Sequence, residues 1–255
     1  MPFDLITIPC LSDNYAYLLR DHASGEVAVI DVPEAGPIAA ELTARGWTLS
    51  QVWITHHHWD HVDGLADLLA DHPARVAGAV ADADRLPKLD LAVSEGDTVT
   101  LGALTAVIFD VSGHTINHIA YYVPQANAVF TADSLMALGC GRLFEGTPDQ
   151  MWSSMQKLMA LPADTTICSG HEYTASNAKF ALTVDPDNTA LISRSNDITA
   201  AREKGVPTVP SLLSTELETN PFLRAADPGI RATLGRPNAT DAEVFAEIRK
   251  RKDHF

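Results

Sequence analysis

The chain of 255 residues is acidic, because 33 Asp and Glu residues outnumber 18 Lys and Arg residues and give a formal net charge of −15. That charge argues against a nucleic-acid backbone or an anionic membrane as the main partner. Apolar residues make up 46% of the chain, which is typical of a globular enzyme with a substantial core.

Short strand-like runs dominate the first two thirds of the chain. Apolar alternation or short continuous apolar runs predict strands, whereas apolar residues at helical spacing predict helices at residues 37–46 and 65–72. Adjacent strands with helices between some of them favour a layered α/β fold. The strands are expected at residues 3–10, 14–21, 26–32, 51–55, 75–80, 97–111, 118–124, 128–132 and 165–170.

From about residue 172 the pattern becomes helical, apart from a proline-containing connector at residues 206–222. The sequence therefore predicts two domains, residues 1–171 and a small helical domain at residues 172–255. The helices of the second domain are expected at residues 177–188, 188–205 and 241–253.

The cysteines suggest a reducing compartment, and the lengths of the apolar runs argue against a membrane span. Cys10, Cys140 and Cys168 stand far apart, so neither a disulfide framework nor a CxxC pair is visible. The N-terminal segment has no basic region, and no apolar run approaches the roughly 18 residues that a membrane span requires. We therefore expect a cytoplasmic protein that does not associate with a membrane.

The stretch THHHWDH at residues 55–61 holds four of the ten histidines and one aspartate. It lies between a strand-like run and a helix-like run, on a loop that a rigid scaffold can present to a ligand. A single histidine there would be an ordinary surface or core residue. A hydrophobic core, however, could not supply hydrogen-bond partners for so many ring nitrogens without a large free-energy cost. Neutral imidazole and carboxylate are common ligands of zinc and similar cations, so the stretch predicts a metal site.

Three further candidate ligands stand at the ends of strand-like runs. His114 follows LTAVIFD, Asp133 follows AVFTA, and His171 follows TTIC. Taken alone, His114 could be a capping or core residue, and Asp133 could be the N-cap of a following helix. The repeated strand-end placement supports all three as ligands.

Together these motifs resemble the metallo-β-lactamase superfamily, and within it the glyoxalase II or hydroxyacylglutathione hydrolase family. The superfamily resemblance rests on T-H-x-H-x-D-H, the later G-H, the A-D after a strand and S-G-H-E-Y. The motifs GHEYT and NPF and the basic C-terminal IRKRKDHF are specific to the smaller family. The likeness covers almost the whole chain. It implies a four-layer αββα sandwich followed by a small C-terminal helical domain.

The resemblance also implies two divalent metal ions per chain, zinc in the first place, with iron or manganese as alternatives. Such a pair can lower the pKa of a shared water towards ~7 and polarise an acyl carbonyl. Asp60 and Asp133 are then the catalytic carboxylates, acting with a metal-bridging hydroxide. His57 is interpreted as a supporting or structural residue. The implied ligands are His56, His58 and His114 for one ion, Asp60, His61 and His171 for the other, and Asp133 for both.

The family binds glutathione thioesters, whose glycine carboxylate needs a cationic partner. The RKRK run at residues 249–252 could be an ordinary solvated helix end. The resemblance instead implies that Arg249 and Lys252 contact glutathione. The other implied substrate contacts are Arg142, Leu143, Phe144 and Tyr173. The family often has Tyr where this chain has Phe144, so the resemblance implies that one hydrogen bond to the substrate is lost here.

The leading hypothesis is hydrolysis of S-2-hydroxyacylglutathione, typically S-lactoylglutathione, to glutathione and a 2-hydroxy acid such as lactate. This is the second step of methylglyoxal detoxification. The alternatives within the superfamily are a persulfide dioxygenase that uses iron and a hydrolase of lactones or β-lactams, while a nuclease is disfavoured by the charge. From a different class, a non-catalytic metal-binding module is the alternative, although structural zinc sites are usually closed sites of four ligands.

Overall fold

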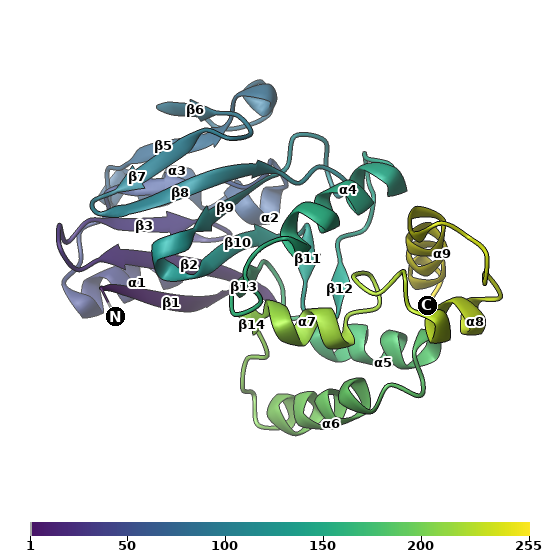
Figure 1. Cartoon of the computed structure of the whole chain (residues 1–255). Helices are drawn as coiled ribbons and strands as arrows, with labels where there is room; N and C mark the ends of the chain where they lie inside the picture. Colours follow the sequence, from purple (N-terminus) through teal and green to yellow (C-terminus); the bar gives the residue numbers. More distant parts are fainter. Residues whose placement is uncertain (1) are drawn as a thin grey trace. The chain divides into compact units, whose positions relative to one another are not determined.

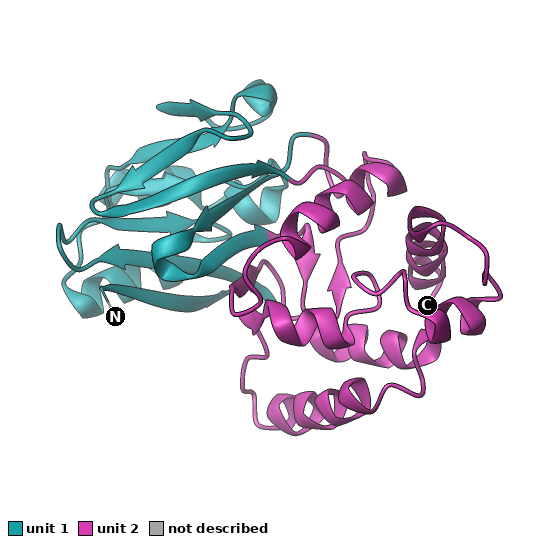
Figure 2. Ribbon diagram, in the orientation of Figure 1, with its two compact units in different colours: residues 1–110, 117–131 teal, residues 111–116, 132–255 magenta. Residues whose placement is uncertain are grey.

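The structure is a computed structural model that describes residues 2–255 (Figure 1). It divides into two compact units (Figure 2). Unit 1 contains the chain up to Asp110 together with Asn117–Thr131, and unit 2 contains Val111–Ile116 and Ala132–Phe255. Within the described range, no helix has both the length and the apolar character needed to cross a membrane.

Unit 1 contains a six-stranded sheet in the order β1-β2-β3-β4-β5-β6. The first three strands pair antiparallel, whereas β3 to β6 pair parallel. Strand β3 is buried at every residue, and β2 at all but one, as expected for strands covered on both faces. The strands are β1 (Phe3–Cys10), β2 (Asn14–Asp21), β3 (Val27–Ile30), β4 (Gln51–Trp53), β5 (Arg75–Ala79) and β6 (Leu91–Val93).

Parallel strands require crossover connections, and short helices supply them in unit 1. Helix α1 packs beside α3 and β1 and buries Ile38 and Leu42. It ends at Gly46, whose φ of 65° lies in the left-handed region that glycine adopts at little cost. The helices are α1 (Ala35–Arg45), α2 (Trp59–Val62) and α3 (Leu65–Asp71), with 3-10 turns at Val80–Asp82 and Pro124–Ala126.

Four more strands of unit 1 pair antiparallel in the order β10-β9-β8-β7. They face the first sheet, because the ring of Tyr121 on β9 stacks on Trp53 of β4 with centroids 5.1 Å apart. The Tyr121 hydroxyl also donates to the Ile54 carbonyl at 2.9 Å. The core of unit 1 therefore lies between the two sheets. The strands are β7 (Thr98–Leu101), β8 (Leu104–Asp110), β9 (Ile119–Val123) and β10 (Ala128–Ala132).

Unit 2 is mainly helical. One of its core clusters joins Leu138 to α5 and α6, which contribute Ala178, Ala181, Leu191 and Ile198. Two short strand pairs complete the unit: β11 (Leu135–Met136) with β12 (Gly139–Cys140), and β13 (Thr166–Ser169) with β14 (Ser211–Leu212). The helices are α4 (Pro148–Met159), α5 (Thr174–Val184), α6 (Thr189–Glu203), α7 (Leu213–Thr219), α8 (Pro228–Leu234) and α9 (Asp241–Asp253).

Residues in and near the NPF motif form hydrogen bonds with the backbone of the β11–β12 hairpin of unit 2. The Asn220 amide donates to the carbonyls of Met136 and Gly139 at 3.1 and 3.0 Å, and the buried Glu216 accepts from the Leu138 amide at 2.8 Å. Glu216 lies within α7, so the predicted connector at residues 206–222 contains a helix. The connector anchors the hairpin and is not a free linker.

All three cysteines are buried free thiols. Burial is the main cause that raises the pKa of the Cys10 and Cys140 thiols to about 11. Burial alone raises the pKa of Cys168 further still. These thiols therefore stay protonated at neutral pH.

Replacing Tyr121 tests the contact between the two sheets of unit 1. Tyr121→Phe keeps the ring on Trp53 but removes the donor to the buried Ile54 carbonyl. We expect the free energy of unfolding to fall by about 1–3 kcal/mol, the usual cost of leaving a buried acceptor unsatisfied. Chemical denaturation measures the change. Tyr122→Phe, at the next and half-buried position, is the control and should change it by less than about 0.5 kcal/mol. Equal midpoints for the two variants would contradict the role given to the hydroxyl.

Candidate metal centre

In unit 1 the THHHWDH stretch runs from the end of β4 into helix α2. His56 and His61 are fully buried, while His58 and Asp60 are half-buried. The donor atoms of His56 and His58 lie within 4.8 Å of each other, and His61 Nε2 lies 4.0 Å from Asp60 Oδ2. This loop therefore carries four donors in close proximity.

Asp31 orients two of these imidazoles. Its Oδ2 accepts from His61 Nδ1 at 2.8 Å and from the Thr55 hydroxyl at 2.8 Å. Because the Thr55 hydroxyl donates to Asp31, its oxygen accepts from His56 Nδ1 at 3.0 Å. Both histidines thus carry their ring proton on Nδ1 and keep the Nε2 lone pair for a ligand.

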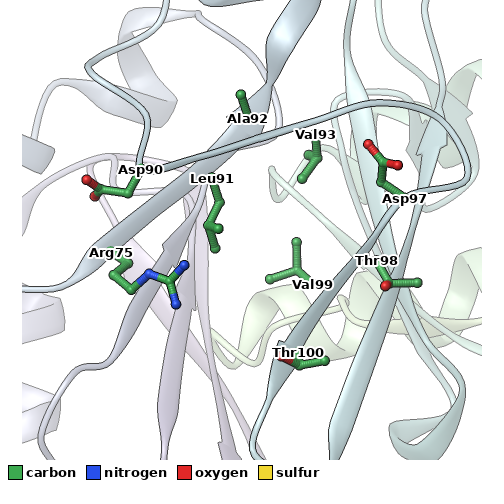
Figure 3. A pocket seen from close by; sticks show the side chains of 9 residues that line it. All are labelled: Arg75, Asp90, Leu91, Ala92, Val93, Asp97, Thr98, Val99 and Thr100. Carbon is green, nitrogen blue, oxygen red and sulfur yellow. The ribbon is translucent and has the colours of Figure 1, made fainter.

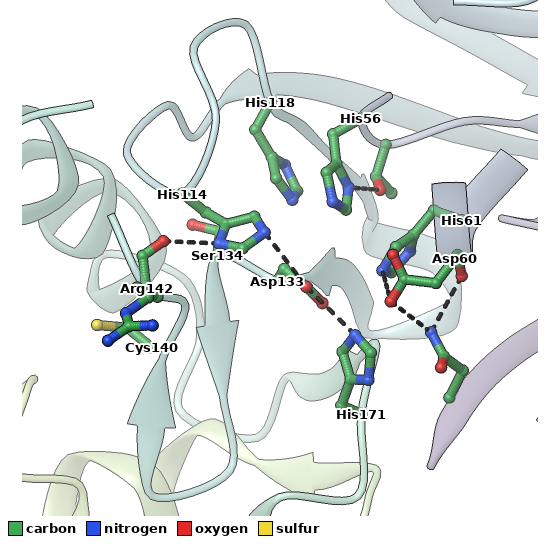
Figure 4. Close-up of polar contacts among 12 residues, drawn as sticks. His56, Asp60, His61, His114, His118, Asp133, Ser134, Cys140, Arg142 and His171 are labelled. Carbon is green, nitrogen blue, oxygen red and sulfur yellow. Dashed lines mark hydrogen bonds and ion pairs between the residues drawn. The ribbon is translucent and has the colours of Figure 1, made fainter. Parts of the chain in front are cut away.

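In unit 2 two buried imidazoles converge on one buried carboxylate oxygen. Asp133 Oδ2 lies 3.3 Å from His114 Nε2 and 3.3 Å from His171 Nε2 (Figure 4). His114 Nδ1 donates to the Arg142 carbonyl at 2.7 Å, which again leaves Nε2 as the lone-pair atom. Each of the three predicted strand-end ligands is therefore in place within this unit.

These separations fit a bound metal. Ligand atoms of a tetrahedral zinc ion, bound at about 2.0–2.1 Å, lie about 3.3–3.4 Å from one another. A single carboxylate oxygen close to two imidazole nitrogens also suits a carboxylate that two ions share. Both units thus hold clusters of His and Asp donors suited to a binuclear metal site.

Comparison with known proteins identifies the family. Residues 12–171 match the metallo-beta-lactamase superfamily, and residues 172–255 match the hydroxyacylglutathione hydrolase C-terminus. Over the whole of both chains, the sequence is 66% identical to the hydroxyacylglutathione hydrolase of Ruegeria pomeroyi and 63% identical to that of Roseobacter denitrificans. The chain belongs to the hydroxyacylglutathione hydrolase family. The resemblance drawn from the sequence motifs is confirmed.

Solved structures agree on the fold of this family member. ETHE1 from Myxococcus xanthus superposes with a TM-score of 0.69 at 25% identity, covering 98% of this chain and 90% of that one. BLEG-1, a B3 metallo-beta-lactamase, superposes with a TM-score of 0.67 at 18% identity, covering 86% and 99%. The predicted metallo-β-lactamase-like fold with a helical C-terminal domain is confirmed. The predicted boundary at residue 172 stays a prediction.

Several supporting residues of the family site were missed in the sequence. Asp31 follows β3 with a φ of 56°, so the strand-end placement that singled out Asp133 could also have found it. Asn14 donates to the carbonyl and the carboxylate of Asp60 at 3.0 and 3.2 Å. His118 stacks on His56 with ring centroids 4.4 Å apart. Neither Asn14 nor His118 has a local sequence signal for these contacts.

His57 faces a different partner from the ligands beside it. Its Nδ1 lies 3.1 Å from Asp82 Oδ2, and its Nε2 lies 3.4 Å from an Arg85 nitrogen. These contacts connect the loop to the 3-10 turn at Val80–Asp82, which suits the supporting role expected for His57.

Two exposed aromatic rings lie against the histidines of unit 2. The Phe144 ring meets His114 edge-on at 5.3 Å and is 62% exposed, whereas Tyr173 stacks on His171 at 4.6 Å and is 41% exposed. Leu143, beside Phe144, is half-buried. The implied substrate contacts Phe144 and Tyr173 therefore stand beside the candidate ligands His114 and His171 and face solvent.

The basic residues expected to contact the substrate occupy different environments. Arg142 is exposed and lies over the Phe144 ring at 6.0 Å. Lys252 is half-buried, with its ammonium 3.4 Å from the Ser176 carbonyl and hydroxyl. Burial, followed by the nearby Arg249 charge, lowers the pKa of Lys252 to about 8. Arg249 itself is only 6% exposed, so it is not a solvated helix end.

A separate cavity of about 550 Å³ opens in unit 1 between β6 and β7 (Figure 3). Its two aspartates have structural partners, because Asp90 accepts from the Val76 amide at 2.9 Å and Asp97 from the Ser94 amide at 2.8 Å. No predicted ligand is among the residues that line it, so the cavity is not the metal centre. Those residues are Arg75, Asp90, Leu91, Ala92, Val93, Asp97, Thr98, Val99 and Thr100.

Removing Asp31 tests the orientation of the unit 1 ligands. In Asp31→Ala the Nδ1 proton of His61 loses its acceptor and the Thr55 hydroxyl is released. We expect about 10–100-fold weaker metal binding, the usual effect of losing a partner of a ligating histidine. Metal retained after dialysis against graded chelator measures it, with circular dichroism as the check on folding. Asp63→Ala removes an exposed carboxylate of the same loop. Equal retention by the two variants would rule out the orienting role.

Proposed function

We propose that the protein is a dinuclear metallohydrolase that cleaves the thioester of S-2-hydroxyacylglutathione, typically S-lactoylglutathione, to glutathione and a 2-hydroxy acid. The observation that carries the proposal is the position of Asp133 Oδ2, 3.3 Å from the Nε2 atoms of both His114 and His171. The curated relatives at 66% and 63% identity bear the name of this hydrolase, which supports the same reaction for this chain.

The predicted His and Asp donors would hold the two ions. When bound, the pair supplies a Lewis acid for the thioester carbonyl and lowers the pKa of a water molecule towards about 7. Zinc fits the imidazole and carboxylate donors well, and iron or manganese fits them too. We assign His56, His58 and His114 to one ion, Asp60, His61 and His171 to the other, and Asp133 to both.

The chain's own residues would fix the reacting groups. Asp31, Thr55 and the Arg142 carbonyl hold three ligand rings in one tautomer. Asn14 holds the Asp60 carboxylate, which we assign with Asp133 to the catalytic site. A thiolate is a good leaving group, so a thioesterase needs no strong general acid, in contrast to an amidase. The described contacts would thus orient the ligand side chains, and the thioester itself contains a bond that is easily broken.

The glutathione carrier would lie along the exposed side chains of unit 2. Tyr173 offers a phenol beside His171, and Phe144 offers an aromatic surface beside His114. Arg142 and Lys252 offer positive charge to the carboxylates of the carrier. Glutathione is anionic, so these cations would attract it to an otherwise acidic protein.

Steady-state hydrolysis of S-lactoylglutathione by protein of known metal content tests the proposed reaction. We expect the thioester absorbance to fall with zinc-loaded protein, and the activity to vanish after chelation and to return with zinc. Asp133→Ala should lower kcat by about 10²–10³-fold or more, as removal of one main electrostatic group of an active site does. His72→Ala, a histidine outside both clusters, is the control. Stable thioester in the presence of metal-loaded protein would exclude this function.

The lowered pKa of Lys252 predicts a pH dependence of substrate binding. The ammonium is charged below its pKa of about 8 and loses its proton as the pH rises through that value. KM for S-lactoylglutathione should therefore rise between pH 7 and pH 9, by up to about tenfold, because only about a tenth of the groups stay charged one unit above the pKa. Since kcat reflects the metal centre, the effect should appear mainly in KM.

Lys252→Arg is the matched control, because an arginine keeps its charge throughout this range. Its KM should stay level between pH 7 and pH 9. The same rise of KM in the arginine variant would assign the pH dependence to another group.

A further inference from the structure

The segment Cys140–Arg142 of unit 2 lies directly against the metal ligands of that unit (Figure 4). The carbonyl of its last residue accepts from His114 Nδ1 at 2.7 Å. Its middle residue, Gly141, is packed so closely that a Cβ there would stand 2.0 Å from the Asp133 carbonyl oxygen and 2.8 Å from His114 Nδ1. The position of this segment therefore sets the position of the His114 ring.

The same segment is held on its other side by helix α9. Arg249 Nη1 donates to the Cys140 carbonyl at 2.9 Å. Asp253 Oδ1 accepts from Arg249 Nε at 3.0 Å and lies 2.8 Å from Arg249 Nη2. The Asp253 carboxylate also lies 3.5 Å from Arg142 Nε, and the Asp253 carbonyl accepts from Arg142 Nη2 at 3.3 Å. Both ends of the segment are thus tied to two residues of one helix.

We propose that Arg249 and Asp253 form a C-terminal clamp that positions the metal ligand His114. The guanidinium of Arg249 holds the Cys140 carbonyl, and Asp253 holds both Arg249 and Arg142. A displacement of either residue passes through the segment to the carbonyl that fixes the His114 proton on Nδ1. This inference rests on the metal site of the proposed function and gives Arg249 a role that a substrate contact alone does not include.

The burial of the clamp supports a positioning role. Arg249 is 6% exposed, lies 5.2 Å from the Phe222 ring and has each end of its guanidinium occupied by protein oxygens. A planar guanidinium with several fixed donors can hold a carbonyl and a carboxylate together, which the single ammonium of a lysine cannot do. The Asp253 side chain is partly exposed, whereas that of Arg249 is buried, so removing Asp253 leaves a buried charge without its partner and Arg249 moves. The clamp is therefore sensitive to conservative replacements.

Metal release by the purified full-length protein tests the clamp. Wild type, Arg249→Lys and Asp253→Asn are loaded with Co²⁺, and release is followed in a chelator titration. We expect the ion assigned to His114 to leave both variants at a chelator concentration about tenfold lower than in the wild type. Loss of a hydrogen-bond partner of a ligating histidine weakens metal binding by roughly 10–100-fold, and the clamp acts on that partner indirectly, so the low end applies. The second ion should leave as in the wild type. The visible Co²⁺ absorption should change in the same variants, because it reports ligand geometry.

Lys250→Ala is the matched control, because it removes a positive charge from the exposed face of α9 without touching the segment. Its titration should match the wild type. Unchanged release in both clamp variants, or equal weakening of both ions, would overturn the proposal. If Arg249→Lys does not fold, as judged by thermal unfolding, Asp253→Asn and Arg142→Gln decide the result. Asp253→Asn removes the charge that Arg249 and Arg142 share, and Arg142→Gln removes, of the clamp contacts, only those of Arg142 with Asp253. No thioester is used, so failure of the proposed hydrolysis would not affect this outcome.

Discussion

The fixed Nδ1 proton of three buried histidines is the constraint on which the site depends. His61 donates it to a carboxylate, His56 to a hydroxyl and His114 to a carbonyl. The first two acceptors follow β3 and β4 in unit 1, and the third follows β12 in unit 2. Because a neutral imidazole protonated on Nδ1 has only one lone pair, the ligand atom is chosen before any metal binds. The scaffold thus prepares the donors through ordinary hydrogen bonds.

The strands of this chain and the positions of its candidate ligands could largely be predicted because their signals are local. Strands β1 and β2 start and end at the expected residues, and Asp133 and His171 follow their strands as expected. The region 97–111 was expected as one strand but forms β7 and β8, because Gly102 with a φ of 58° reverses the chain between them. Strands of two residues, such as β11 and β12, are too short for any periodicity to appear.

The supporting contacts could not be predicted because they join residues distant in sequence. Asp31 and His61 are 30 residues apart, and Asn14 and Asp60 are 46 apart. The Arg249 contact with Cys140 spans 109 residues. From the sequence, Arg249 and Lys252 look like equivalent cations of one basic run. Their different burial separates them, because one is held by protein oxygens and the other lies half-exposed beside aromatic rings.

The burial of all three cysteine thiols keeps them away from the thiol that the proposed reaction would release at every turnover. Thiol–disulfide exchange requires an accessible thiolate, and Cys10 and Cys140 have pKa values of about 11 behind a closed surface. The three thiols should therefore exchange only slowly with glutathione disulfide. Cys140 lies within the clamped segment, so modification there would displace the Arg142 carbonyl from His114. The low reactivity of the Cys140 thiol thus preserves the position of the nearby candidate ligand His114.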